Sequence, residues 1–348
     1  MSKLKVAIGS NATPEVAARL AADEALDVTY DADLYIPWRY AGNWPRPTDA
    51  PQRTPEQQKR FMSQLREAEV IFGLPDESAT LLHEVVDGND NLRWLHTMAA
   101  GGGGQVRGAK LSDEQLNQIT FTTSAGAHAE ELAEFAVFGA LAGAKDLPRS
   151  QADQRNHVWG GRWLPRHLHE LTVVIVAMGE IGRACVRVFD ALGTKRIIGV
   201  NRSPFELPGV EAHTVDSLLT AAAEADVLIN CLPAAVGTEK LISAEVLAAT
   251  KPGCVIVSVG RGTCIDEDAL IVGLKNGHLG YAALDVVAHE PLDPASELWD
   301  LPNVLITPHN MALSLRQPEQ VIDLFLENAH AYIEGRPMRN VMNKQLFY

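Results

Sequence analysis

The chain has 348 residues, of which 46% are hydrophobic and 21% are charged, and its formal net charge is -14. This balance is that of a globular protein, and the length suits two domains. The acidic excess argues against binding to nucleic acid, whose phosphates need basic surfaces. No apolar stretch is long enough to span a bilayer, and the first residues lead directly into a strand-like pattern. We therefore expect a cytoplasmic protein that does not bind membranes.

The four cysteines are widely spaced and form no CxxC pair, so we expect all four to be reduced packing residues. They are Cys185, Cys231, Cys254 and Cys264. The pair His167 and His169 has no further ligand candidates nearby, which argues against a metal site.

Strand-like runs alternate with helix-like runs almost throughout the chain, which predicts parallel sheets covered by helices. In the first part, the expected strands are 5–8, 70–72, 94–96 and 120–122. The expected helices there are 14–22, which Thr13 and Pro14 open, and 55–67. The proline-rich segment 38–53 should be irregular.

A change in character near residue 125 indicates a second α/β series. It begins with a long apolar-rich helix at 128–144, followed by a loop or arm at 151–165 that carries Trp159 and Trp163. The expected strands are 172–176, 197–200, 227–230, 255–259, 281–284 and 304–307. The expected helices are 181–192, 215–225, 244–249 and 267–276, with a closing amphipathic helix at 318–334 before Gly335.

The stretch TVVIVAMGEIGR, residues 172–183, has the strand–turn–helix order of a dinucleotide-binding turn. Such a turn brings the backbone close to a pyrophosphate and places it at a helix N-terminus. The first glycine of the G-x-G-x-x-G pattern is replaced by Ala177, whose methyl group a negative φ would accommodate. Taken alone, the turn fits a purely structural strand–helix connection equally well. The residues predicted to contact the cofactor are Met178, Gly179, Glu180, Ile181 and Gly182.

The next expected strand is followed by Asn201, Arg202 and Ser203. Folds that select NAD usually place an acidic residue here, on the ribose hydroxyls. A carboxylate would repel a 2′-phosphate, whereas Arg202 and Ser203 can bind one through charge-assisted hydrogen bonds. The sequence therefore favours NADP, with NAD as the alternative cofactor. The simpler interpretation of Arg202 is an exposed loop arginine.

Three segments in the second half carry candidate catalytic residues. VSVGRGTCIDEDAL contains Arg261, ALDVVAHEPLD contains Glu290, and LWDLPNVLITPHNMA contains His309. An arginine can bind a carboxylate with its planar fork, and a histidine can give and recover a proton near neutral pH. Each residue alone also fits an ion pair, a solvated acid or a packing histidine. Their order and spacing favour a common site.

This ordered set resembles the D-isomer-specific 2-hydroxyacid dehydrogenases across nearly the whole second half of the chain. The matching residues include Arg261-Gly262 with Asp266, then Asp285, Glu290-Pro291, Leu301-Pro302-Asn303-Val304 and Thr307-Pro308-His309. The resemblance implies reduction of a small 2-keto acid to a D-2-hydroxy acid. Arg261 and His309 would contact the substrate, Glu290 would pair with His309, and a nicotinamide would supply the hydride.

The resemblance also implies further contacts. Asp285 would meet the nicotinamide amide, and other cofactor contacts would come from Leu232, Pro233, Thr238, Val259 and Gly260. The backbone of Ala100 and Gly101 would hold the substrate carboxylate. Three more glycines, 102–104, follow this loop, and we expect them to make it mobile.

The resemblance further implies two doubly wound, parallel-sheet α/β domains. A Rossmann-type dinucleotide-binding domain, residues 126–313, would be inserted into a flavodoxin-like substrate domain, residues 1–125 and 314–348. The helix that starts at His128 would lie in a homodimer interface.

Two other functions remain open. A formate- or phosphite-type dehydrogenase could have the same fold, although formate enzymes carry Gln where this chain has Glu290. A nicotinamide-sensing corepressor-like protein, which binds partner proteins, could retain all three catalytic residues.

Overall fold

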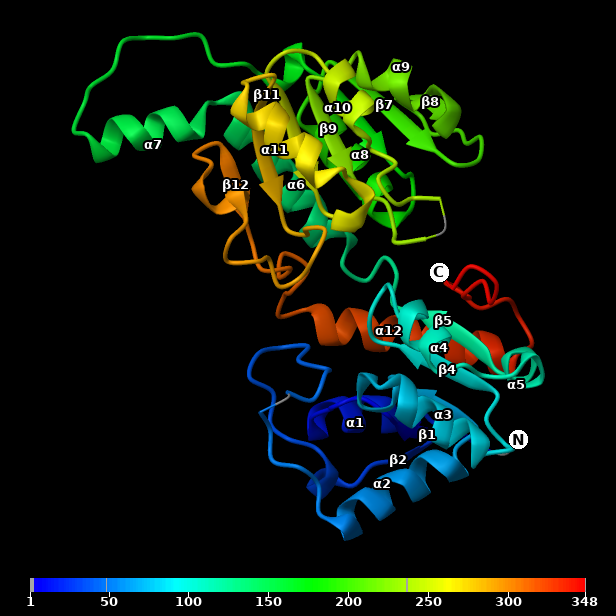
Figure 1. Cartoon of the computed structure of the whole chain (residues 1–348). Coiled ribbons are helices and arrows are strands. Elements are labelled where there is room, and N and C mark those ends of the chain that lie inside the picture. The colour runs from blue at the N-terminus through cyan, green and yellow to red at the C-terminus, as the bar shows by residue number, and fades with distance from the viewer. Residues whose placement is uncertain (1–2, 48, 236, 348) are drawn as a thin grey trace. The chain divides into compact units, whose positions relative to one another are not determined.

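The computed structural model describes residues 3–47, 49–235 and 237–347. The chain forms two compact units, which Figure 1 shows: unit 1 comprises residues 1–127 and 313–348, and unit 2 comprises residues 128–312. Within the described residues, no helix is both long enough and apolar enough to cross a membrane.

Unit 1 is built on a five-stranded parallel sheet with the order β2-β1-β3-β4-β5, the flavodoxin-like order. Its strands are β1 (Leu4–Ile8), β2 (Leu26–Thr29), β3 (Val70–Phe72), β4 (Trp94–Thr97) and β5 (Thr120–Thr123). Its helices are α1 (Pro14–Ala21), α2 (Pro55–Glu67), α3 (Ala79–Asp87), α4 (Gly103–Gly108), α5 (Asp113–Gln118) and α12 (Gln317–Ile333).

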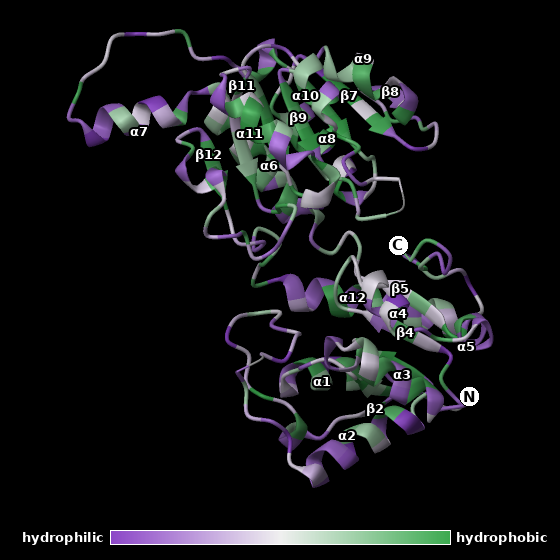
Figure 2. Cartoon of the chain, in the orientation of Figure 1, coloured by the Kyte–Doolittle hydropathy of each residue, from purple (hydrophilic) through white to green (hydrophobic). Residues whose placement is uncertain are grey.

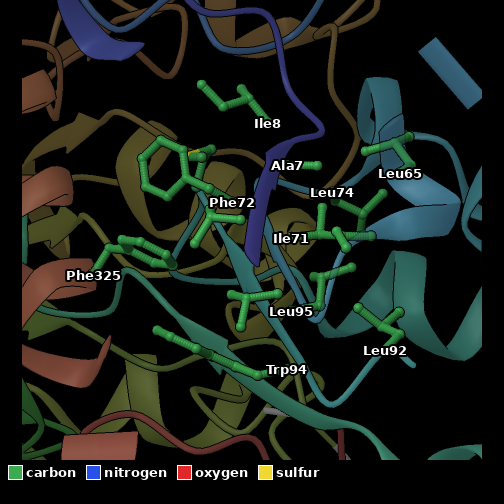
Figure 3. Packing of buried hydrophobic residues seen from close by; sticks show 14 of the residues in the cluster. Ala7, Ile8, Leu65, Ile71, Phe72, Leu74, Leu92, Trp94, Leu95 and Phe325 are labelled. Atoms are coloured by element: carbon green, nitrogen blue, oxygen red, sulfur yellow. The ribbon is translucent and has the colours of Figure 1, made fainter. Parts of the chain in front are cut away.

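The core of unit 1 joins residues that are far apart in the sequence. Figure 3 shows Phe325 of α12 beside Phe72 and Trp94, which lie on neighbouring strands. The Phe325 ring stacks on that of Trp94 and meets that of Phe72 edge-on, with 4.8 Å between centroids in each case. Burial of these aromatic rings holds the closing helix on the first part of the chain.

Unit 2 contains a seven-stranded parallel sheet with the order β12-β11-β10-β9-β6-β7-β8. Its strands are β6 (Thr172–Val176), β7 (Arg196–Asn201), β8 (Val210–Thr214), β9 (Val227–Asn230), β10 (Cys254–Ser258), β11 (Leu279–Leu284) and β12 (Val304–Ile306). Its helices are α6 (Ala129–Ala144), α7 (Leu147–Arg155), α8 (Glu180–Ala191), α9 (Leu218–Ala222), α10 (Ala244–Ala249) and α11 (Glu267–Lys275). Strand β6 follows α6 and α7 in the chain and lies between β9 and β7, so the strand order reverses there.

The central strands of unit 2 are buried on both faces, and Figure 2 shows them as predominantly hydrophobic. Helix α6 packs against α8, β10 and β11 on one side of the sheet. Burial on both faces explains the continuous apolar runs that predicted these strands.

The predicted fold class is confirmed, and the predicted strands match the observed ones to within about two residues at each end. One prediction of local structure was wrong, since residues 151–155, expected in a loop, belong to α7. The helix expected at 215–225 is present but shorter, as a 3-10 turn, Val215–Ser217, followed by α9. Strands β2 and β8 and helices α3, α4 and α5 were not predicted.

Candidate active site

The three candidate catalytic residues follow three neighbouring strands of unit 2. Arg261 comes after β10, Glu290 after β11 and His309 after β12, and these strands are adjacent in the sheet. Because the strands are parallel, all three residues lie at the carboxyl edge, where ligands bind in open α/β sheets.

Glu290 and His309 are in direct contact. The Nδ1 atom of His309 lies 2.7 Å from Oε2 of Glu290, and both side chains are more than one-third exposed. An ionised carboxylate can only accept, so Nδ1 carries the proton in this bond and Nε2 is the nitrogen left to exchange a proton. Oε1 of Glu290 accepts from the backbone N–H of Val287, which fixes the carboxylate.

Asp285 fixes the loop that carries His309. Its side chain is buried, and Oδ1 accepts hydrogen bonds from Thr307 Oγ1 at 2.7 Å and from the backbone N–H of Asn310 at 3.0 Å. The Asp285 carbonyl accepts from the backbone N–H of His309, whose φ is +50°. A left-handed histidine is a strained residue that its surroundings must hold in place. This anchoring function of Asp285 was not predicted from the sequence.

Asn230 supports Arg261 and was also missed. It is fully buried at the end of β9, and its side-chain amide donates to the Arg261 carbonyl at 3.0 Å. Its Oδ1 accepts from the backbone N–H of Leu232, in the predicted cofactor loop. A polar residue that closes a buried apolar run is the sequence signal that could have found it.

The φ of Ala177 is +82°, not the negative value that would accommodate its methyl group without strain. The methyl group therefore occupies a conformation that favours glycine, at a cost of about 1–2 kcal/mol. The Ala177 carbonyl lies close to Gly182, where an added Cβ would come within 2.1 Å of the carbonyl oxygen, so position 182 requires glycine. The turn thus has the tight geometry of a dinucleotide-binding turn although its first glycine is missing.

We predict that Ala177→Gly stabilises the protein. Glycine removes the left-handed strain but gains freedom in the unfolded chain, so the free energy of unfolding should rise by about 0.5–1 kcal/mol. Urea unfolding measures this change. The control is Ala248→Gly, at an exposed helical position of α10, which should lower stability by about 0.5–1 kcal/mol. A loss of stability from Ala177→Gly would show that the turn is not strained.

The residues around this turn fit a dinucleotide. Gly179 caps the twelve-residue helix α8, and a Cβ placed on it would meet no other atom within 4 Å. Free N–H groups and open space at a helix N-terminus suit a pyrophosphate. Asn201 links the turn to the segment after β7, since its Oδ1 accepts from Met178 N–H and its amide donates to the Ser203 carbonyl. Arg202 lies exposed between Asn201 and Ser203.

Further polar contacts lie at the ends of β12, β9 and β10. Oδ1 of Asn310 is buried without a hydrogen-bond partner in the described part of the chain, beside His309, and an unpaired acceptor suits an amide donor. The loop of Leu232 and Pro233 is closed by Thr238, whose hydroxyl accepts from Ala235 N–H at 2.9 Å. Val259 and Gly260 both donate their backbone N–H groups to the Asn230 carbonyl.

The cysteines of unit 2 are packing residues, as predicted. All four are free and buried. A hydrogen bond to Cys185, together with burial, raises the pKa of Cys231 well above its usual value, and burial raises the pKa of Cys264. Both thiols therefore stay protonated and are poor nucleophiles.

The predicted substrate loop lies in unit 1, whereas the other predicted site residues lie in unit 2. Ala100 and Gly101 follow β4 and are exposed. The three glycines after them, which the sequence analysis expects to make the loop mobile, differ in their surroundings. Gly102 and Gly103 are buried, and a Cβ on either would meet another atom at less than 3 Å. They allow close packing, and only Gly104 has open space around it.

A parallel sheet with a reversal of strand order and a glycine-rich turn at its central strand defines the class of dinucleotide-binding α/β proteins. Within this class, the chain matches one family. The family model "D-isomer specific 2-hydroxyacid dehydrogenase, NAD binding domain" matches residues 137–311. The chain therefore belongs to the D-isomer specific 2-hydroxyacid dehydrogenases, a family of NAD(P)-dependent enzymes.

Individual proteins agree with this assignment. A protein of Corynebacterium melassecola, named only by its position beside proB, is 31% identical over 73% of this chain and 83% of its own length. Glyoxylate/hydroxypyruvate reductase B of Pectobacterium atrosepticum is 32% identical over 54% of this chain and 59% of its own length. A D-isomer specific 2-hydroxyacid dehydrogenase of Xanthobacter autotrophicus Py2, solved with NADPH and MES, is 26% identical with a TM-score of 0.79 and full coverage of both chains.

Proposed function

We propose that the protein uses NADPH to reduce a small 2-keto acid to the D-2-hydroxy acid. The contact between Glu290 and His309, at the same sheet edge as Arg261, carries this proposal. His309 supplies a proton donor and Arg261 a carboxylate-binding cation, the two groups that keto-acid reduction needs besides a hydride. The named relatives that reduce glyoxylate or hydroxypyruvate support this substrate class.

In the mechanism, Arg261 holds the substrate carboxylate through its guanidinium fork. Its Nη1 donates to the Gly260 carbonyl at 2.8 Å, which steers the side chain and leaves other donors for the substrate. Nε2 of His309 gives a proton to the carbonyl oxygen, while Glu290 stabilises the ring and fixes its tautomer. A bound nicotinamide supplies the hydride. Asp285 and Asn310 would hold its amide.

The preference for NADPH rests on Arg202. β7 ends at Asn201 rather than at a repelling carboxylate, and Arg202 and Ser203, which follow it, supply a cation and a hydroxyl. Unit 2 is thus the dinucleotide-binding domain in this proposal, and unit 1 is the substrate domain.

We predict that Arg202→Ala weakens NADPH binding about ten- to a hundredfold and leaves NADH binding almost unchanged, since one charge-assisted contact contributes about 1.5–3 kcal/mol. Cofactor fluorescence titration measures both dissociation constants. The control is Lys195→Ala, an exposed cation at the opposite end of β7, which should affect neither cofactor. Equal losses of both cofactors, or equal wild-type affinities, would exclude 2′-phosphate recognition by Arg202.

An assay of 2-keto acids with both cofactors tests the proposed function. The panel contains glyoxylate, pyruvate, hydroxypyruvate, phenylpyruvate and branched-chain acids, with formate and phosphite assayed in the oxidative direction. We expect turnover of at least one small 2-keto acid with NADPH. Turnover of formate or phosphite alone would support the alternative dehydrogenase. NADPH binding without any turnover would favour the corepressor-like alternative.

We also propose that the protein is a homodimer. The segment 147–167, from α7 to the next turn, has no buried residue, and Figure 1 shows it extending away from the sheet of unit 2. Trp159 and Leu164 are almost completely exposed there, at 101% and 97%. Phe138 is exposed on α6, which precedes this segment. Large apolar side chains that the described residues of their own chain leave exposed indicate an interface, and we propose a second copy as the partner.

We predict that Trp159→Ala combined with Leu164→Ala shifts the protein from dimer to monomer, because the two side chains lose the apolar area that they bury against the partner copy. Analytical ultracentrifugation measures the mass in solution. Leu315→Ala, at a leucine that is 90% exposed in unit 1, is the matched control and should remain dimeric. A wild-type monomer at micromolar concentration would contradict the proposal.

A further inference from the structure

We propose that Phe347 is a positioning residue. It seats the segment Asn343–Phe347 on residues 99–103 of unit 1, here called the glycine loop, and so fixes the backbone of Ala100 and Gly101 that is proposed to bind the substrate. This inference rests on the proposed function for the role of the loop, but the contact itself is a property of unit 1 alone. Figure 1 shows the segment at the red end of the chain.

The contact is a close approach of two backbones. A Cβ on Gly103 would come within 1.7 Å of the Phe347 carbonyl oxygen and 3.1 Å of its Cβ. No residue larger than glycine fits at position 103 unless the segment moves. The Phe347 side chain packs against the hydrophobic core of unit 1, which keeps its backbone in this position.

The segment reaches Gly103 along a defined path. After α12, Val341 forms an antiparallel bridge with Thr122 of β5, and Met342 donates its N–H to the Phe121 carbonyl at 2.8 Å. Met342 is buried. The Asn343 carbonyl then accepts from Phe347 N–H, which closes the turn that brings Phe347 over the loop.

The glycine loop is thereby held from two sides. On the strand side, Thr97 donates its hydroxyl to the Ala99 carbonyl at 2.9 Å, and Ser124 donates its N–H to the same carbonyl at 3.3 Å. On the other side lies Phe347. Between these contacts Ala100 and Gly101 are exposed. An exposed backbone fixed at both ends is preorganised to donate N–H groups to a carboxylate, and small displacements of such a group are costly.

A double-mutant cycle tests this role, with Gly103→Ala and Phe347→Ala alone and together. Alanine at a helical position such as 103 should by itself favour the helix, so a harmful effect would come from the contact. We expect each single variant to raise the KM for the 2-keto acid roughly tenfold, with kcat and the NADPH dissociation constant changed less than about twofold. The double variant should be no worse than the single ones, because both break one contact.

Two matched variants distinguish this effect on the loop from a general loss of structure or stability. Gly104→Ala makes the same change one residue later, where a Cβ meets nothing, and should behave as wild type. Phe347→Leu keeps an apolar side chain in the core and should restore the KM. Amide hydrogen exchange of residues 98–104 gives a readout without activity, and exchange should be faster in Phe347→Ala.

The outcomes distinguish this inference from the proposed function. If wild type reduces no 2-keto acid, the proposed function fails, and hydrogen exchange still decides whether Phe347 holds the loop. Unchanged exchange in Phe347→Ala would overturn the contact. Unchanged KM in both Gly103→Ala and Phe347→Ala, in an active enzyme, would overturn its role in positioning the loop.

Discussion

Replacing His309 with alanine should lower kcat for 2-keto acid reduction by at least about a hundredfold, the usual contribution of a general acid. The dissociation constant of NADPH should stay nearly the same, because no cofactor contact is predicted for the His309 side chain itself. Stopped-flow or steady-state absorbance at the nicotinamide band measures kcat. The control is His289→Ala, which removes an exposed histidine from the loop that carries Glu290.

Because His309 and Glu290 are in contact at 2.7 Å, we expect the effects of replacing them to be non-additive. If Glu290 acts only through the imidazole, Glu290→Gln should lower kcat in wild type and have little further effect in His309→Ala. Independent, multiplicative losses would show that the two residues do not work as a unit. A His309→Ala variant with near wild-type turnover would remove this histidine from the mechanism.

Arg261→Lys should lower kcat/KM roughly ten- to a hundredfold although the charge is retained, because one bond of the planar fork, about 1.5–3 kcal/mol, is lost. Arg261→Ala should lose both bonds, which corresponds to roughly 10² to 10⁴ in kcat/KM. Neither variant should weaken the binding of NADPH.

Arg187→Lys provides the control for this pair of variants, because Arg187 is exposed on α8 and pairs with Glu130. It should leave kcat/KM unchanged. Full activity in Arg261→Lys would show that a point charge suffices and that no bidentate contact with the carboxylate exists.

The fold could be predicted wherever burial left a pattern in the sequence. The central strands of unit 2, such as Thr172–Val176, are apolar at nearly every position because helices cover both faces. Strand β8, Val210–Thr214, is an edge strand with no fully buried residue, and its sequence VEAHT shows no such run. Helix α7 buries nothing, so its sequence has no apolar periodicity to detect.

The residues of the candidate site were predicted where the chemistry requires a particular residue type. Features that depend on tertiary contacts, such as a backbone conformation or a close approach, were not predicted. Arg261, Glu290 and His309 were found from their order, and the structure brings Glu290 against His309. The positive φ of Ala177 depends on how the turn is held against Gly182, which no local preference reveals. The contact of Gly103 with Phe347 joins residues that are far apart in the sequence, so the glycine run was interpreted as mobile.

The most direct test of the account follows the hydride itself. The 2-keto acid of the panel that is turned over fastest to a chiral product is incubated with the enzyme and NADPH deuterated at C4 of the nicotinamide, on each face in turn. The 2-hydroxy acid formed is analysed by mass spectrometry and chiral chromatography. We expect the D-2-hydroxy acid, with one deuterium at C2 for one of the two labelled cofactors. Product without deuterium from either cofactor, or the L isomer, would contradict the account.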